Sequence, residues 1–137
     1  MSKLSRRDFM KSSVAIGAGL ALAGPASRVL GANDDIRIAV IGVGGQGGGH
    51  MGYFSKIPGV RLVAICDADR DHVENQAADF EKKNGVKLRT YTDMRELLDN
   101  KEIDAVTSAT PNHWHALTTV WACQAGKDVY IEKPACH

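Results

Sequence analysis

The sequence predicts an α/β fold, a doubly wound parallel sheet with helices on both of its faces. Short apolar segments rich in β-branched residues alternate with longer segments of helical composition, which is typical of consecutive β-α-β units. Glycine and proline stand at the boundaries between these segments, at Pro58, Gly85, Pro111 and Gly126. Polar residues gather directly after the apolar segments, where the carboxyl ends of parallel strands present their loops to ligands.

The first β-α-β unit is predicted from residue 36 to residue 66. Residues 36–41 are apolar except for Arg37, so they form the first strand. Residues 46–56 follow as a glycine-rich helix, which Pro58 and Gly59 end because proline cannot continue a helix and glycine favours a turn. Residues 61–66 return to apolar side chains and form the second strand.

The middle of the chain is predicted to contain two helices with a short strand between them. Residues 70–83 form a helix that Gly85 ends, and residues 88–91 form the strand. Asp93 precedes Glu96 by three residues, which is the spacing of a capping box, so we expect a short helix from this point through Leu98.

The last predicted unit contains a strand, a helix and a final strand. Residues 105–109 form the fourth strand, and Pro111 separates it from a helix over residues 114–124. Gly126 closes this helix because glycine readily adopts the left-handed conformation that follows a helix end. Residues 129–132 form the fifth strand.

The first strand runs directly into a G-x-G-x-x-G turn, whose residues are Gly42, Val43, Gly44, Gly45, Gln46 and Gly47. Gly42 permits the tight turn, Gly44 lets backbone N–H groups approach a pyrophosphate, and Gly47 lets the helix pack close to the strand. The phosphates then lie at the amino terminus of a helix, where unpaired N–H groups and the helix dipole favour negative charge. The motif therefore predicts a dinucleotide-binding Rossmann fold.

Asp67 supports this interpretation because it follows the second strand, 20 residues after Gly47. An acid at about this spacing binds the adenosine ribose in dinucleotide-binding folds. A flexible glycine linker, or a strand-to-helix turn without a ligand, is the alternative, because Gly48, Gly49 and Gly52 extend the glycine run. The apolar strand before the glycines and the acid after the next strand argue against that alternative.

Residues 1–32 have the organisation of an export signal. Arg6 and Arg7 form a twin-arginine pattern within residues 5–11, and a weakly apolar stretch and small residues follow. The apolar stretch, residues 14–23, is far shorter than the roughly 20 residues that span a membrane. We therefore expect recognition by the twin-arginine export machinery and a periplasmic or extracytoplasmic location. A surface amphipathic helix, a disordered basic tail and an uncleaved membrane anchor are the alternatives.

Beyond the signal, residues 33–137 hold 12 basic and 15 acidic side chains. Without a basic stripe, this part of the chain is not expected to bind nucleic acid or an anionic membrane. His113 and His115 lack the further ligands that a metal site needs, so no metal is expected. Cys66 and Cys123 are interpreted as buried thiols.

The chain resembles the Gfo/Idh/MocA oxidoreductases, which are NAD(P)-dependent sugar and polyol dehydrogenases and their relatives. The resemblance extends over residues 36–137 and is carried by residues 110–115 (TPNHWH) and above all by residues 125–134 (AGKDVYIEKP). It implies that residues 33–137 are an incomplete Rossmann domain, which in the family precedes an α/β domain holding most of the substrate pocket. We expect the chain to be the first part of a longer protein, which forms a homo-oligomer.

The resemblance also implies roles for individual residues. Lys133 is implied to lie beside the nicotinamide and the substrate hydroxyl, where a cation polarises the alcohol or helps to deprotonate it, and burial is expected to lower its pKa. Glu132 is implied near the nicotinamide ribose. Asp67 is implied to bind the adenosine hydroxyls and to repel a 2′-phosphate, so NAD is favoured over NADP. The other implied cofactor-binding residues are Thr110, Asn112, His115 and Arg70, although Arg70 is equally well explained as a solvated helix charge.

Three functions stay open at this point. The first is a dehydrogenase that uses NAD to oxidise a secondary hydroxyl of a sugar or polyol. The second is a redox-neutral, NAD-retaining glycosidase or lyase. Export favours this second function because free NAD is scarce outside the cytoplasm, whereas Lys133 favours the dehydrogenase because glycosidase-like relatives often lack that lysine. The third is a nucleotide-binding protein without catalysis. The chain alone is expected to bind NAD weakly and to turn nothing over, because half of the pocket is missing.

Overall fold

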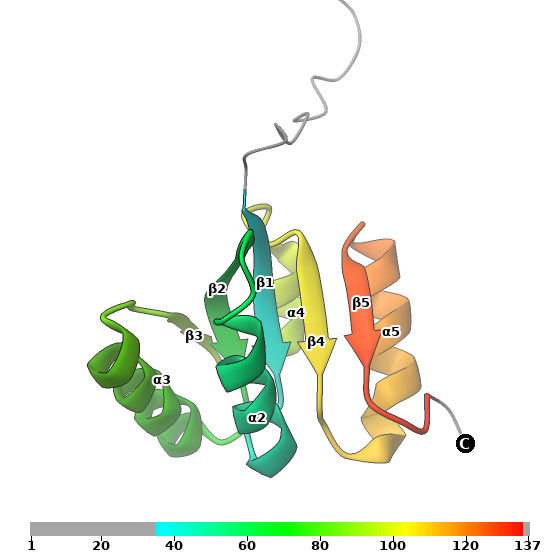
Figure 1. Cartoon of the computed structure of the whole chain (residues 1–137). Coiled ribbons are helices and arrows are strands. Elements are labelled where there is room, and N and C mark those ends of the chain that lie inside the picture. The colour runs from blue at the N-terminus through cyan, green and yellow to red at the C-terminus, as the bar shows by residue number, and fades with distance from the viewer. Residues whose placement is uncertain (1–34, 136–137) are drawn as a thin grey trace, which may run out of the picture. The chain divides into compact units, whose positions relative to one another are not determined.

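The computed structural model describes residues 35–135, which form a five-stranded parallel sheet with helices packed against it (Figure 1). The predicted export signal lies outside the described residues. The strands are β1 (Ile36–Ile41), β2 (Val60–Cys66), β3 (Arg89–Tyr91), β4 (Ala105–Ser108) and β5 (Asp128–Ile131), in the spatial order β3-β2-β1-β4-β5. The predicted α/β class and doubly wound parallel sheet are confirmed.

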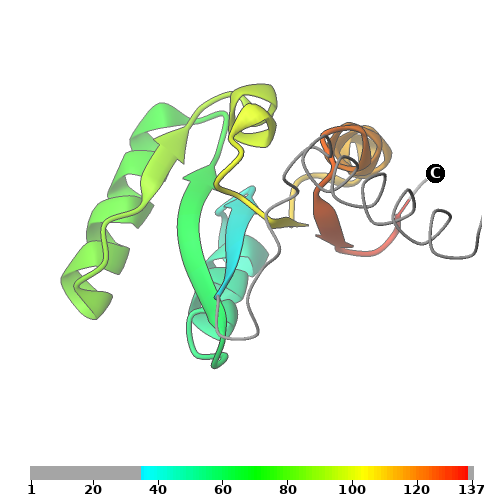
Figure 2. The ribbon, with the colours of Figure 1, turned by 90° about the horizontal axis from the view of Figure 1, so that it is seen from above.

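Four α-helices connect these strands within the described part of the chain. They are α2 (Gly45–Phe54), α3 (Arg70–Asn84), α4 (Met94–Asp99) and α5 (His115–Gln124), and a short 3-10 helix, η1 (Asn112–Trp114), precedes α5. Helices α2 and α3 cover one face of the sheet, and α4 and α5 cover the other (Figure 2). Among residues 35–135, no helix combines the length and the apolar character needed to cross a bilayer.

Every predicted strand and helix is present, and the predicted boundaries differ from the observed ones by at most two residues. The largest difference is at the end of α2, which stops at Phe54 because the chain tightens there: Lys56 N–H donates to Tyr53 O (3.1 Å) and Ile57 N–H donates to Phe54 O (3.2 Å). Such bonds to the third preceding residue often end an α-helix.

The helix caps follow the chemistry that the sequence predicts. Asp69 accepts a hydrogen bond from His72 N (3.1 Å) at the start of α3, and Gly85 ends this helix with a φ of +68°. At the start of α4, Asp93 is the N-cap residue and accepts from Arg95 N (2.9 Å), the second residue of the helix, whereas the capping-box bond predicted from the spacing would go to Glu96 N. These caps fix where the loops after β2 and β3 begin and end.

The core has one apolar cluster on each face of the sheet, and β1 contributes to both. Val40 packs with Met51, Val73 and other side chains from the α2–α3 face. Ala39, which points to the opposite face, packs with Leu97 and other residues from the α4–α5 face. Because side chains alternate along a strand, a strand covered on both faces must be apolar at nearly every position, as β1 is.

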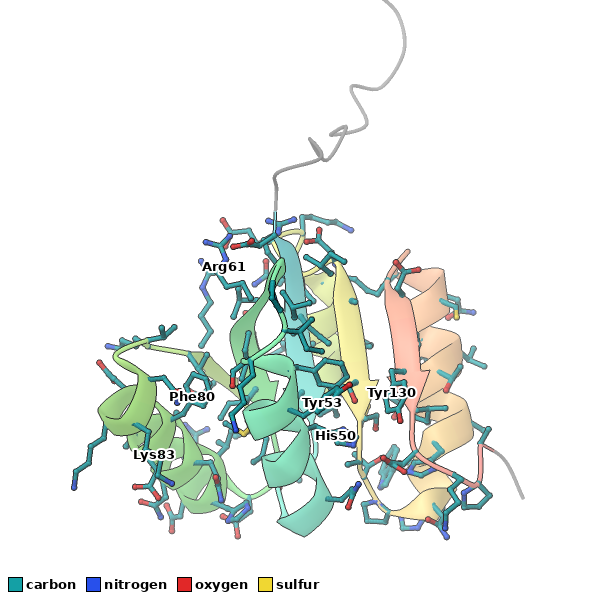
Figure 3. The ribbon with its side chains drawn as sticks, in the orientation of Figure 1. His50, Tyr53, Arg61, Phe80, Lys83 and Tyr130 are labelled. Carbon is teal, nitrogen blue, oxygen red and sulfur yellow. The ribbon has the colours of Figure 1, made fainter. Side chains whose placement is uncertain are left out.

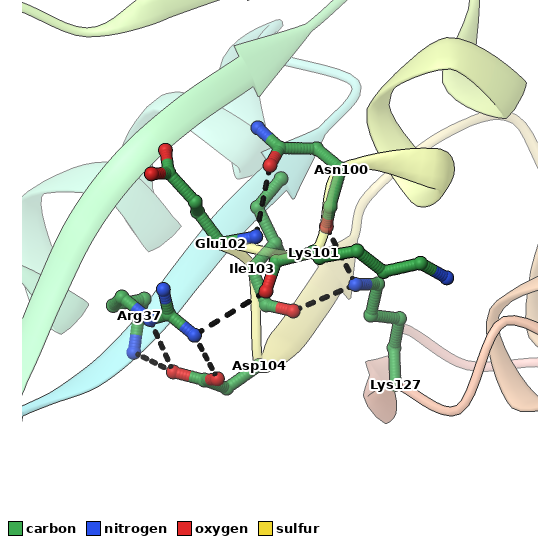
Figure 4. Close-up of polar contacts among 7 residues, drawn as sticks. All are labelled: Arg37, Asn100, Lys101, Glu102, Ile103, Asp104 and Lys127. Carbon is green, nitrogen blue, oxygen red and sulfur yellow. Dashed lines mark hydrogen bonds and ion pairs between the residues drawn. The ribbon is translucent and has the colours of Figure 1, made fainter. Parts of the chain in front are cut away.

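The parallel strands all begin at the same end of the sheet, its amino-terminal edge, and a polar network holds this edge together (Figure 4). Arg37, on β1, forms two side-chain hydrogen bonds to Asp104, Nη2 to Oδ1 (2.6 Å) and Nε to Oδ2 (2.9 Å). Lys127 Nζ donates to the backbone oxygens of Asn100 (2.6 Å) and Ile103 (2.7 Å). The hydrogen bond from Arg37 lowers the pKa of Asp104, while desolvation lowers the pKa of Lys127. The network joins the start of β1 to the residues just before β4 and β5.

Candidate cofactor site

The glycine turn after β1 is closely packed at two of its glycines. Gly42 has a φ of +79°, and a Cβ placed there would lie 3.0 Å from Thr110 N. A Cβ on Gly47 would lie only 1.7 Å from Gly42 O, a backbone atom that cannot move aside cheaply. Glycine at position 47 is therefore what lets α2 start directly against the end of β1, as the motif predicts.

The start of α2 is open. Gly44 is the N-cap residue of the helix, no side chain caps the helix there, and a Cβ on Gly44 would meet nothing within 4 Å. Gly44, Gly45 and Gln46 are exposed. The first amides of an α-helix have no acceptor within the helix, so these N–H groups face open space at the positive end of α2. A pyrophosphate fits the open start of this helix, which no side chain fills.

Asp67 directs its carboxylate at the glycine turn. Its Oδ2 accepts a hydrogen bond from Val43 N (3.0 Å), and its Oδ1 accepts from Asp69 N (3.1 Å). Each carboxylate oxygen can accept a further bond, so Asp67 can brace the loop and still bind the hydroxyls of a ribose. The acid predicted from its spacing to the glycines thus lies against them in space.

A cavity of about 550 Å³ opens beside Asp67. Its walls come from the ends of β1 and β2, the β3–α4 loop and the segment after β4; they include Gly42, Asp67, Arg95, Thr110, Pro111, Trp114 and Trp121. Flat aromatic and apolar walls next to a carboxylate match an adenosine, whose base is flat and whose ribose carries hydroxyls. Trp114 is 38% exposed, and both Trp114 and Trp121 line the cavity.

Two arginines stand at the starts of the helices that follow β2 and β3. Arg70 is exposed and lines a separate small cavity with Glu96, so its place beside the adenine stays a prediction. Arg95, which the sequence did not single out, lines the large cavity and is paired with Asp93, with Nη2 2.5 Å from Oδ2. The hydrogen bonds from Arg95 lower the pKa of Asp93 to about 2.

Glu132 follows β5, and side chains from α2 hold it. Its Oε1 accepts hydrogen bonds from His50 Nε2 (2.8 Å) and Gln46 Nε2 (3.4 Å), and the bond from His50 is the main cause of the lowered pKa of Glu132. His50 is buried, and its Nδ1 lies 2.8 Å from Thr107 Oγ1 on β4. Neither His50 nor Thr107 was predicted as a site residue, although the one-turn spacing of Gln46 and His50 was a signal in the sequence.

Lys133 and the polar side chains after β4 lie at the same edge of the sheet. Lys133 is exposed, so the burial expected for it is absent in this part of the protein. Thr110 Oγ1 lies 3.1 Å from Ser108 Oγ, and Asn112 is exposed at the start of η1. The loops after β4 and β5 therefore present a cation and two polar side chains at the edge of the sheet that also carries the glycine turn.

His115 is buried and contacts backbone oxygens through both ring nitrogens. Nε2 lies 2.8 Å from Thr110 O, and Nδ1 lies 2.7 Å from Pro134 O. The ring therefore ties the loop after β4 to the segment that carries Lys133. Its implied contact with a cofactor stays a prediction, and the geometry shows a side chain that positions the two segments.

Of the two cysteines expected to be buried, Cys66 is buried and Cys123 is not. Cys66 is buried, and burial raises its pKa to about 12, so the thiol is not a nucleophile at neutral pH. Cys123 is exposed, contrary to the expectation of a buried thiol, because it lies on the outer face of α5. Within residues 35–135, no three His, Cys, Asp or Glu side chains gather in the geometry of a metal site.

Solved structures with the same fold include dehydrogenases. The chain is similar to a myo-inositol 2-dehydrogenase from Lactobacillus plantarum, with 36% identity, a TM-score of 0.65, and coverage of 75% of this chain and 29% of that one. It is also similar to the scyllo-inositol dehydrogenase from Lactobacillus casei with bound NAD(H) and scyllo-inositol, with 27% identity, a TM-score of 0.65 and the same coverage.

Among curated proteins, the chain is similar to a glycosyl hydrolase family 109 protein from Solibacter usitatus. The two are 36% identical, and the match covers 100% of this chain but 34% of the relative. A protein of the same description from Shewanella sp. strain W3-18-1 is 31% identical over 98% of this chain and 34% of the relative. The chain thus spans about a third of the length of these relatives.

Two family models match the chain. Residues 3–23 match the twin-arginine translocation pathway signal sequence, which confirms the predicted export signal and the export that it directs. Residues 36–137 match the oxidoreductase family with an NAD-binding Rossmann fold, which confirms the predicted cofactor, NAD. Because this second match covers the whole described domain, the chain belongs to the Gfo/Idh/MocA family of NAD-binding oxidoreductases.

Proposed function

We propose that this chain is the NAD-binding domain of an exported oxidoreductase that oxidises a secondary hydroxyl of a sugar or polyol. The observation that carries the proposal is the position of Glu132 and Lys133, directly after β5 and on the sheet edge that also holds the glycine turn and Asp67. Parallel strands bring these groups, which are far apart in the sequence, to one ligand-binding edge. The likeness to inositol dehydrogenases supports a polyol or sugar as the substrate.

The arrangement of the site suggests how NAD lies in it. The open start of α2 binds the pyrophosphate through backbone N–H groups. The adenosine enters the cavity beside Asp67, which binds the ribose hydroxyls and repels the 2′-phosphate of NADP. The cavity borders the ends of β1 and β2, whereas β5 lies on the far side of β4, so the nicotinamide half extends toward Glu132 and Lys133.

Lys133 is the proposed catalytic residue. NAD, held by the start of α2, Asp67 and Glu132, would supply the hydride acceptor for oxidation of the carbinol carbon. The O–H proton of the alcohol would pass to a base or to water. The ammonium group of Lys133 donates a hydrogen bond to the substrate oxygen and stabilises the negative charge that grows there as the proton leaves. Thr110 and Asn112 supply polar contacts from the loop after β4.

The proposed whole protein has residues 1–32 as the export signal and residues 33–137 as the first part of a Rossmann domain. The chain spans about a third of its curated relatives, so we propose that a second domain of the full-length protein covers Lys133 and completes the substrate pocket. We further propose that the full-length protein is a homo-oligomer.

The test is NADH formation by the full-length protein with a panel of inositols, hexoses and pentoses. We expect Lys133→Met to lower the rate by about 100-fold or more, the usual contribution of a positioned acid or base. NAD affinity should change by less than about threefold, because the lysine acts on the substrate. Lys133→Arg is the matched control, since it keeps the charge and should retain part of the rate. Equal rates for the Met variant and the wild type would refute the role of Lys133.

A redox-neutral glycosidase is the second candidate, because the curated relatives are named glycosyl hydrolase family 109 proteins and the chain carries an export signal. In that reaction a ring carbon is oxidised, the adjacent C–H loses its proton, the glycosidic bond breaks by elimination, and the hydride returns to the sugar after water adds. Aryl glycosides in deuterated water separate the two candidates. The glycosidase releases phenol, incorporates deuterium next to the oxidised carbon and accumulates no NADH, whereas the dehydrogenase accumulates NADH.

A further inference from the structure

The feature that the proposed function leaves unexplained is a buried histidine between α2 and the sheet. His50 is 7% exposed, and its ring lies between those of Phe54, whose centroid is 6.0 Å away, and Tyr130, whose centroid is 5.8 Å away. Figure 3 labels His50 and Tyr130. A buried imidazole needs partners for its polar atoms, and both nitrogens of His50 have one. The partners are Thr107 on β4 and Glu132 after β5.

The direction of the hydrogen bonds follows from the chemistry of the partners. An ionised carboxylate only accepts, so Nε2 of His50 carries the hydrogen that is donated to Glu132 Oε1. The hydroxyl of Thr107, which can donate or accept, fixes the other side of the ring. Gln46, one turn earlier on α2, reaches the same oxygen of Glu132. One oxygen of the carboxylate is thus held by two side chains of the helix whose start forms the pyrophosphate site.

We propose that His50 is a positioning residue, which fixes the carboxylate of Glu132 so that it can bind the nicotinamide ribose of NAD. This inference rests on the proposed function, because it assumes that the nicotinamide half extends toward β5. The bond from α2 to Glu132 couples the two halves of the site: the helix that binds the pyrophosphate also sets the orientation of the group that meets the far ribose. Loss of His50 should therefore affect NAD but not ligands that end at the pyrophosphate.

The experiment compares the affinities of NAD and ADP for the full-length protein by isothermal titration calorimetry. ADP contains the adenosine and the pyrophosphate but lacks the nicotinamide ribose, so it reports the rest of the site. The two test variants differ in reach: the amide nitrogen of Asn lies near the position of Nδ1, and that of Gln near the position of Nε2. His50→Asn therefore keeps the contact with Thr107 and loses Glu132, while His50→Gln keeps a donor for Glu132.

We expect His50→Asn to weaken NAD binding about tenfold, the loss that one charge-assisted hydrogen bond typically causes, with ADP affinity changed by less than about twofold. His50→Gln should restore most of the NAD affinity. A parallel loss of NAD and ADP affinity in His50→Asn would overturn the proposal, because it would show a general structural role. Unchanged NAD affinity would overturn it as well.

A second variant keeps the test decisive if His50→Asn does not fold. Glu132→Gln changes a partly exposed side chain and removes the charge that His50 holds. It should show the same selective loss of NAD affinity, and wild-type NAD affinity in this variant would overturn the proposal. Wild-type protein that binds ADP as tightly as NAD would overturn it while leaving the dinucleotide site intact. Wild-type protein that binds neither would overturn the proposed function itself.

Discussion

The two edges of the sheet use polar groups in opposite ways. At the amino-terminal edge, Arg37 donates a hydrogen bond to Asp104, and Lys127 donates to two nearby backbone oxygens. At the carboxyl-terminal edge, the start of α2 has no side-chain cap, and a cavity opens beside Asp67. At the amino-terminal edge the polar groups are hydrogen-bonded within the protein, whereas at the carboxyl-terminal edge polar groups are left open to a ligand.

The two lysines that flank β5 show this difference within one short segment. Lys127, just before the strand, is 7% exposed and donates to two backbone oxygens. Lys133, two residues after the strand, is exposed. Both belong to the same motif, residues 125–134, yet only the second has a free ammonium for chemistry at the ligand edge. A motif can therefore contain structural and functional positions side by side, and the sheet decides which is which.

The largest expected effect is at the tightest contact of the ligand edge. Gly47→Ala puts a Cβ 1.7 Å from Gly42 O, so α2 must move away from β1. We expect a loss of about 3 kcal/mol in the free energy of unfolding, near the upper end for overpacking, together with loss of NAD binding. Urea unfolding and calorimetry measure the two effects.

Gly49→Ala is the matched control, since it lies in the same helix and its Cβ would meet nothing within 4 Å. It should stabilise the protein by about 1 kcal/mol, because alanine favours helix more than glycine does. Equal effects of the two substitutions would show that the close contact at Gly47 does not matter.

The next effect should appear at the amino-terminal edge and leave ligand binding alone. Lys127→Met keeps much of the side-chain volume but removes the donor to the oxygens of Asn100 and Ile103. We expect a loss of about 2 kcal/mol in the free energy of unfolding, because buried acceptors lose their partner. NAD affinity of the folded variant should stay within about twofold of wild type. A large loss of NAD affinity measured by calorimetry would contradict the separation of the two edges.

A smaller effect, on ligand binding, is expected at Asp67. Asp67→Asn keeps the shape of the side chain and one acceptor oxygen, but it removes the negative charge and one of the two oxygens that accept from Val43 N and Asp69 N. NAD affinity should fall about tenfold, as for loss of one charge-assisted bond, while NADP affinity should rise because the repulsion of its 2′-phosphate is gone. Titrations with both dinucleotides measure the ratio, and an unchanged preference for NAD would show that Asp67 does not select the cofactor.

The smallest expected effect is a pH dependence at the amino-terminal edge. The hydrogen bond from Arg37 lowers the pKa of Asp104 below its ordinary value of 3.8. Its folded-state pKa is the lower one, so the stability that it contributes is fully present above pH 3.8 and is lost as the pH falls through the folded-state pKa. Below pH 3.8, the free energy of unfolding of Asp104→Asn should fall by about 1 kcal/mol less than that of the wild type. Urea unfolding at several pH values measures this difference. Parallel pH profiles of the variant and the wild type would exclude this contribution.

Local patterns were enough to predict the elements and part of the site. Among residues 35–135, the alternation of apolar and helical segments predicted every strand and every α-helix, though not the short helix η1, because periodicity and turn residues act over a few positions. The spacing of Gly42, Gly47 and Asp67 predicted a contact that the structure contains, since Asp67 accepts from Val43 N at the glycine turn. In contrast, the exposure of Trp114 and Cys123 was not predictable from helix spacing, which does not say which face meets the sheet.

The sequence by itself determined that the chain forms a parallel α/β sheet whose strands end in a glycine turn, an acid and a Glu-Lys pair, because these features depend on local geometry. Only the tertiary structure decided that His50 reaches across to Glu132, and that Lys127 is buried while Lys133 is exposed. The physical reason is the packing of helices onto the sheet. It joins side chains that are 57 and 82 residues apart around one imidazole ring, a relation that no local pattern encodes.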